Sequence, residues 1–204
     1  MKAAFLISLI TFMAFSGSTE LHAAVADADE RSLDVSLDLL KSASDEAFLK
    51  AAARENLAEI ALAKLAIQKS SSPDVHHLAR YLIQEHTTAQ RQLETVATRR
   101  DVRLPATMGR AHDAVEQQLS RLNGPAFDEG YARHLQLDQQ KVLSDHQTIA
   151  RDGADPDVRR YASAQVTELE QNLAMVQQLA GSAAANGATN GPIETSARHG
   201  LSSR

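Results

Sequence analysis

Apolar residues recur at alternating three- and four-residue intervals along four long segments of the chain. This spacing places apolar side chains on one face of an α-helix. It predicts helices over roughly residues 45–69, 73–99, 125–150 and 156–180. A further amphipathic stretch, residues 108–122, lies between the second and the third of them. The pattern therefore predicts an all-α protein.

The ends of these segments carry residues that favour helix termini. The tripeptides Ser-Pro-Asp at 72–74 and Asp-Pro-Asp at 155–157 each place a capping side chain before a proline and an acid. Asn-Gly-Pro at 123–125 ends one helix and starts the next. Two hairpins with short turns, joined by a long and partly helical crossover, are typical of the ferritin-like four-helix bundle. The sequence predicts that fold.

Both ends of the chain differ from the helical segments. Residues 1–23 contain a basic residue, then an apolar run and small residues, as in a secretory signal peptide with cleavage after residue 23 or 26. The run is shorter than the about 20 residues that a membrane-spanning helix needs. Residues 27–43 form an acidic N-terminal segment, and residues 44–181 carry the bundle. Residues 182–204, rich in Gly, Ala, Asn and Ser, predict a disordered tail.

Composition narrows the location and the partners of the protein. There is no cysteine, which excludes disulfides, thiolate metal ligands and lipid attachment through an N-terminal cysteine. The formal net charge is −5 and the basic residues are scattered, so nucleic acid is not an expected partner. No membrane-spanning segment remains after cleavage of the signal peptide. We therefore expect a periplasmic protein, or alternatively one that is peripheral to the outer membrane.

Each predicted core row carries polar residues near its middle. His86 is the only polar member of the apolar row in its helix. If the first hairpin turns near residue 71, Glu59 and His86 lie within about 3 Å along the bundle axis, at about 1.5 Å per residue. This register predicts a Glu59–His86 hydrogen bond inside a buried polar layer. His134 and His146 lie one face away and are expected at the core boundary. The predicted layer comprises Glu55, Glu59, His86, Asp138, Gln139, Gln165 and Asn172.

A metal site is the alternative to a structural role for these residues. Di-iron bundles use a Glu from each of two helices and a Glu-x-x-His pair from each of the other two. No Glu-x-x-His occurs in the chain, and Leu82 and Ile83 stand where the second Glu would be needed. A simpler site would hold a single transition metal through Glu59, His86 and Asp138. A buried charge is costly unless it is paired, so a self-satisfying polar layer is the competing interpretation.

Two stretches of the chain are similar to an exported bacterial family of unknown function. They read ENLAEIALAKLAIQKSSSPDVHHLARYLIQEHTTAQRQL and LPATMGRAHDAVEQQLSRLNGPAFDEGYARHLQLDQQKVL. The family is commonly labelled "predicted outer membrane protein" and is grouped with ferritin-like bundles, and the resemblance covers about residues 48–180. The family usually has Asp-His where this chain has Asp138-Gln139, and often a His where it has Asn172. The positions to which the resemblance points are Glu59, His86, His112, Phe127, Tyr131 and Asp138.

The sequence favours a non-catalytic exported envelope protein that acts by binding or interaction. A role during stress is one version of this hypothesis. Its partner would be a protein or a small ligand of the envelope. Neither a Gly-x-Ser-x-Gly elbow nor a glycine-rich phosphate loop is present, and no catalytic or cofactor-binding residue is predicted. The alternative is a ferritin-like metal-binding or redox protein that uses Glu59, His86 and Asp138.

Overall fold

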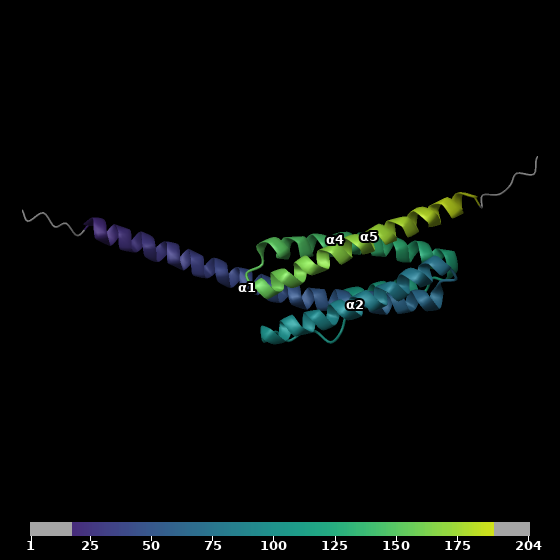
Figure 1. The fold of residues 1–204 in the computed structure, drawn as a ribbon, viewed down its shortest axis with the longest axis horizontal. Helices are drawn as coiled ribbons and strands as arrows, with labels where there is room; N and C mark the ends of the chain where they lie inside the picture. The colour runs from purple at the N-terminus through teal and green to yellow at the C-terminus, as the bar shows by residue number, and fades with distance from the viewer. Residues whose placement is uncertain (1–17, 190–204) are drawn as a thin grey trace, which may run out of the picture. The chain divides into compact units, whose positions relative to one another are not determined.

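A computed structural model describes residues 18–189, which form five α-helices and no β-strand. Side chains are described for residue 37 and residues 39–181. Figure 1 shows the helices in chain order. They are α1 (Ser18–Lys69), α2 (Pro73–Arg99), α3 (Arg110–Ser120), α4 (Gly124–Asp152) and α5 (Pro156–Thr189). The predicted all-α class is confirmed.

The capping signals act as the sequence indicates. The hydroxyl of Ser72 accepts a hydrogen bond of 3.4 Å from the backbone N–H of Val75, in the first turn of α2. The carboxylate of Asp155 accepts from the backbone N–H groups of Asp157 at 2.8 Å and Val158 at 3.1 Å, in the first turn of α5. These side chains satisfy N–H groups that have no partner within a helix. Helix α2 therefore has the bounds predicted from the sequence.

Two helices are longer than predicted. Helix α1 begins at Ser18 and so includes residues 27–43, because no glycine or proline interrupts the chain before Lys69. Helix α5 continues to Thr189, into the segment predicted as a tail. The rest of that tail, residues 190–204, and residues 1–17 of the predicted signal peptide lie outside the described residues. None of the described helices combines the length and the apolar character that crossing a membrane requires.

The chain divides into two units, residues 1–40 and residues 41–204. In the first unit, residues 18–40 are helical. Its described side chains Leu37, Leu39 and Leu40 are exposed. The second unit contains the core and every feature described below.

Two apolar clusters form the core of the second unit, and α1, α2, α4 and α5 contribute to both. One cluster includes Phe48, Leu93, Ile149 and Val158. The other includes Leu62, Leu82, Leu135 and Val176, with Leu119 of α3 added. Helix α5 contacts both α4 and α2, and Figure 1 shows α4 and α5 running alongside each other. On each long helix, the stretch between the two clusters contains buried polar residues beside a few apolar ones.

The turn between α4 and α5 is fastened to α1. One carboxylate oxygen of the buried Asp45 accepts a hydrogen bond of 2.7 Å from the backbone N–H of Asp155. A guanidinium nitrogen of Arg159 donates to the carbonyl of Gly153 at 2.7 Å. The first contact connects segments far apart in the sequence, and the second holds the turn to the first residues of α5.

Candidate functional site

Buried polar side chains occupy the middle of each long helix, between the two apolar clusters. Each of them lies on the inward face of its helix, one turn from apolar residues of the core. The packing that buries the apolar residues therefore buries the polar ones as well. They are Asn56 and Glu59 of α1, His86 of α2, Gln139 and His146 of α4, and Asn172 of α5.

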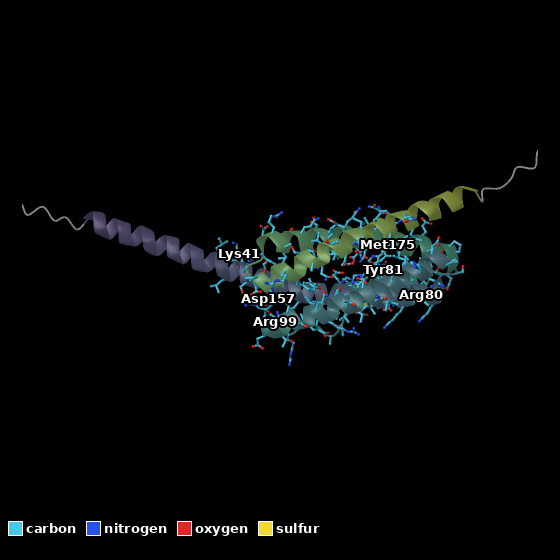
Figure 2. The ribbon with its side chains drawn as sticks, viewed as in Figure 1. Lys41, Arg80, Tyr81, Arg99, Asp157 and Met175 are labelled. Carbon is cyan, nitrogen blue, oxygen red and sulfur yellow. The ribbon has the colours of Figure 1, made fainter. Side chains whose placement is uncertain are left out.

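These side chains line a cavity of about 20 Å³. A cavity of about 10–15 Å³ suffices for one water molecule, so the space has the size of one small polar group. Three further lining residues, Glu85 of α2 and Gln165 and Glu168 of α5, are half-buried and form the outer rim. Figure 2 labels Tyr81 of α2 and Met175 of α5, which pack against the same apolar cluster where these two helices meet. We call the cavity with its rim the polar pocket.

His86 is held by Asn56. Its Nδ1 lies 3.1 Å from the Asn56 side-chain oxygen, while the Asn56 amide nitrogen donates to Gln90 at 3.4 Å. Because an amide oxygen only accepts, Nδ1 of His86 carries the proton and donates it. The other ring nitrogen, Nε2, then presents a lone pair, and it has no hydrogen-bond partner. Burial, together with His146, lowers the pKa of His86 to about 4, so the ring is neutral near pH 7.

The hydrogen bond predicted between Glu59 and His86 is therefore wrong. The partner of His86 is Asn56, one helical turn before Glu59 on α1. The predicted register brought this part of α1 level with His86. The rotation of α1 about its axis decides which of its two neighbouring core rows faces α2, and that rotation results from packing.

Glu59 belongs to a group of three carboxyl groups. Its side chain is buried, and both of its oxygens lack a hydrogen-bond partner of good geometry. Burial, then Asp138 and Glu55, raise the pKa of Glu59 well above its ordinary value. Burial, then Asp138, raise the pKa of Glu55 to about 7. Like charges so close disfavour simultaneous ionisation, so Glu55 and Glu59 retain protons at pH values where isolated glutamates lose them.

The residues of the predicted buried layer differ in their burial. The buried ones are Glu59, His86, Gln139 and Asn172. The half-buried ones are Glu55, Asp138 and Gln165. All of them except Asp138 line the polar pocket.

The residues predicted to bind a metal are only partly brought together. Glu59 and His86 line the polar pocket, whereas Asp138 affects the two glutamates without lining it. Within the described part of the chain, no group of three or more His, Cys, Asp or Glu side chains is arranged to hold a metal ion. The metal site of Glu59, His86 and Asp138 stays a prediction from the sequence.

The predicted layer omitted five polar residues that line the pocket, which are Asn56, Glu85, His146, Tyr161 and Glu168. Asn56 interrupts a second apolar row of α1, the same signal that pointed to His86. Tyr161 of α5 also lines the pocket, and burial raises its pKa to about 12, partly offset by Asn56. His146, expected at the boundary of the core, is buried, whereas His134 is half-buried as expected. His146 donates from Nδ1 to the Val142 carbonyl at 2.8 Å, which explains how α4 accommodates it.

The aromatic positions indicated by the family resemblance lie next to the carboxyl groups. Phe127 and Tyr131 are fully buried and stack with ring centroids 5.6 Å apart. The hydroxyl of Tyr131 has no hydrogen-bond partner, and burial, then Glu59, raise its pKa well above the ordinary value. The nearest nitrogen of His112 is 3.6 Å from Glu55. Phe127, Tyr131 and His112 do not line the polar pocket, whereas Glu55 does.

The fold and the site define the class of protein: an all-α helical bundle with a buried polar pocket. The chain belongs to the family DUF4142, a domain of unknown function, whose family model matches residues 35–179. The resemblance to a family of unknown function is thereby confirmed. No curated protein matches the chain, and no solved structure matches it.

Proposed function

We propose that this protein is a non-catalytic binding protein of the bacterial cell envelope and that the polar pocket is its binding site. The observation that carries the proposal is the set of unpartnered polar atoms around one small cavity. Lining residues with such atoms are Glu55, Glu59, His86, Gln139 and Asn172.

Such atoms weaken the fold. Each buried polar atom without a partner costs about 1–3 kcal/mol. An apolar layer of similar volume would avoid this cost. It would also suit a bundle that packs leucines and alanines on either side of the polar layer. A ligand that supplies the missing hydrogen bonds accounts for the retention of several such atoms at one place.

The chemistry of the lining favours binding over covalent catalysis. Among the described residues, the pocket lining contains no serine, threonine, cysteine or lysine, the side chains that most often form covalent intermediates. His86 is neutral, and its Nδ1 proton is already committed to Asn56. It therefore offers its lone pair to a bound group.

We also propose that the bundle is ferritin-like and that the protein is exported. Supporting the first point, the short turns after α1 and α4 and the long connection that contains α3 match two hairpins with one crossover. The signal-peptide pattern of residues 1–23 supports the second. N-terminal sequencing of the mature protein from the periplasmic fraction tests export, with a start near residue 24 or 27 as the expected result. An uncleaved, membrane-bound product would contradict it.

The same substitution at two positions tests the binding role of the pocket. Asn172 and Asn56 are both buried, but the Asn172 oxygen is unpartnered whereas Asn56 holds His86. If the pocket is kept for a ligand, Asn172→Leu should raise the melting temperature of the ligand-free protein. Asn56→Leu should lower it, because it strands Nδ1 of His86.

The readout is thermal unfolding of each variant with and without a library of small polar molecules. Asn172→Leu should also abolish the stabilisation that the wild-type protein gains from a bound member of the library. If Asn172→Leu destabilises as much as Asn56→Leu, and no molecule stabilises the wild type, the polar layer is purely structural. Elemental analysis of protein purified without an affinity tag tests the metal alternative, which a stoichiometric transition metal would support.

A further inference from the structure

The polar pocket is rich in carboxyl groups, and burial raises the pKa values of three of them, Glu55, Glu59 and Glu85. Four of its lining residues are glutamates, while no lysine or arginine is among the described residues that line it. The ion pairs formed by the described residues include neither Glu85 nor Glu168 at the rim. A bound cation would supply the charge that the protein itself does not.

The deep end of the pocket offers hydrogen-bond acceptors. Burial raises the pKa of Glu59, but a cation bound beside it would favour the ionised form, whose two oxygens only accept. His86 Nε2 presents a lone pair because Nδ1 donates to Asn56. The amides of Gln139 and Asn172 can turn either an oxygen or an NH₂ group inward. Their oxygens are buried and unpartnered, as are those of Glu59. An occupant with several N–H donors would supply hydrogen bonds that these side chains lack.

We propose that the polar pocket binds the primary ammonium group of a small organic amine. This inference rests on the proposed binding function and names its ligand class. An ammonium group carries up to three N–H donors and a positive charge. It has about the size of a water molecule, which matches the cavity of about 20 Å³. The carbon chain of the amine would leave through the rim between α2 and α5.

The rim extends the proposal to diamines. Glu85 and Glu168 come from the two helices that border the opening, and both are half-buried. A second ammonium group, a few carbons from the first, would reach these carboxylates. A diamine should therefore bind more tightly than a monoamine.

Hydrogen bonding to an ammonium group requires a less exact arrangement of these side chains than metal coordination does. A transition metal requires its nitrogen and oxygen ligands at about 2.0–2.2 Å from one point. The described residues provide no group of three or more His, Cys, Asp or Glu in such an arrangement. An ammonium group makes contacts of about 2.7–3.2 Å, which a wider ring of acceptors provides.

The test compares amines that differ in their donors. Methylammonium is the probe for the deep end and 1,4-diaminobutane for the whole pocket, with tetramethylammonium as a control of equal charge that has no N–H donor. Thermal unfolding of the mature wild-type protein is measured at constant ionic strength and neutral pH. Methylammonium at about 100 times its dissociation constant should raise the melting temperature by about 5–10 °C. Tetramethylammonium should leave it unchanged.

Two variants separate the deep end from the rim. Glu59→Gln should weaken methylammonium binding by about 10- to 100-fold, because it replaces a charge-assisted hydrogen bond with a neutral one. Glu168→Gln, at the half-buried rim, should leave methylammonium binding intact and reduce the advantage of the diamine. Circular dichroism checks that both variants are folded, and the rim variant keeps the test valid if Glu59→Gln unfolds.

Each contrary result has a definite meaning. Equal responses to methylammonium and tetramethylammonium would overturn the proposal, since the effect would then be charge alone. Stabilisation by zinc or manganese that chelator removes, with no response to amines, would replace the amine with a metal. If amines fail while other small molecules bind in an Asn172-dependent way, this inference fails and the proposed binding function stands. If no molecule binds, both fail.

Discussion

The imidazole of His86 owes its chemistry to one hydrogen bond. Because Asn56 accepts from Nδ1, the lone pair is on Nε2, which has no partner. A bond to Glu59 instead, as the sequence suggested, would have paired a carboxylate with the ring. In the observed arrangement Glu59 and His86 are both left with atoms to satisfy. Because His86 pairs with Asn56 and not with Glu59, both His86 and Glu59 keep polar atoms without hydrogen-bond partners.

A double-mutant cycle should detect the His86–Asn56 contact. His86→Ala and Asn56→Ala should each destabilise the protein by about 1–3 kcal/mol, since each leaves a buried polar atom without its partner. The double variant should lose less than the sum, because contacting residues do not contribute additively. Urea unfolding gives the free energies. The cycle with Glu59→Ala in place of Asn56→Ala is the control, and a larger coupling there would mean that His86 pairs with Glu59 after all.

Glu55 and His86 should change stability in opposite directions between about pH 4.5 and 6.5, so that their effects largely cancel there. The pKa of Glu55 rises from 4.5 to about 7 on folding, so its contribution is complete below pH 4.5 and is lost as pH rises through 7. The pKa of His86 falls from 6.5 to about 4, so its contribution is complete above pH 6.5 and is lost as pH falls through 4. The measurement is the free energy of unfolding against pH. Glu55→Gln should remove one of the two opposing contributions, so that stability rises with pH between 4.5 and 6.5 in the variant but stays nearly level in the wild type. An unchanged profile would show that Glu55 titrates normally.

At the scale of elements, the turn between α4 and α5 depends on a residue without a side chain. A Cβ atom on Gly153 would lie 2.8 Å from the Ile149 carbonyl oxygen and 3.1 Å from an oxygen of Asp45. The first contact is closer than Cβ atoms show and involves the rigid backbone, and the second is tighter than most Cβ contacts. The glycine lets the turn approach α1, where the other oxygen of Asp45 binds the backbone of Asp155.

Gly153→Ala should therefore destabilise the protein by about 1–3 kcal/mol, the usual cost of overpacking. The matched control is Gly181→Ala in α5, where a Cβ atom would meet nothing within 4 Å. That change should stabilise by about 0.4–1 kcal/mol through the lower chain entropy of the unfolded state. Chemical denaturation of both variants provides the comparison. Similar effects at the two positions would mean that the turn tolerates a side chain.

At the scale of the whole molecule, the bundle should be independent of its C-terminal segment. Deleting residues 182–204 should leave the melting temperature nearly unchanged, because this segment has little apolar surface to offset the entropy of ordering it. The relevant measurement is calorimetry of the shortened and the full-length protein. A decrease of more than about 5 °C, equivalent to about 1–2 kcal/mol, would show that the segment packs on the bundle.

The sequence by itself determined the helical class and the bounds of α2. Local rules suffice there, since apolar periodicity defines the buried face and Ser72 caps its own helix. It also indicated which positions would place polar groups inside, of which Glu59, His86, Gln139 and Asn172 are buried. The length of α1 was underestimated, although the absence of glycine and proline was visible in the sequence.

Only the tertiary structure decided which of these polar groups meet. Helix rotation selected Asn56 over Glu59 as the partner of His86 and left Asp138 outside the pocket lining. Helix rotation is set by the simultaneous fit of side chains from four helices, and no local pattern encodes that fit. The same fit desolvates Glu55 and Glu59 and brings Asp138 beside them, which raises their pKa values. Periodicity places a residue on a face, but its hydrogen bonds and its charge depend on what packs against that face.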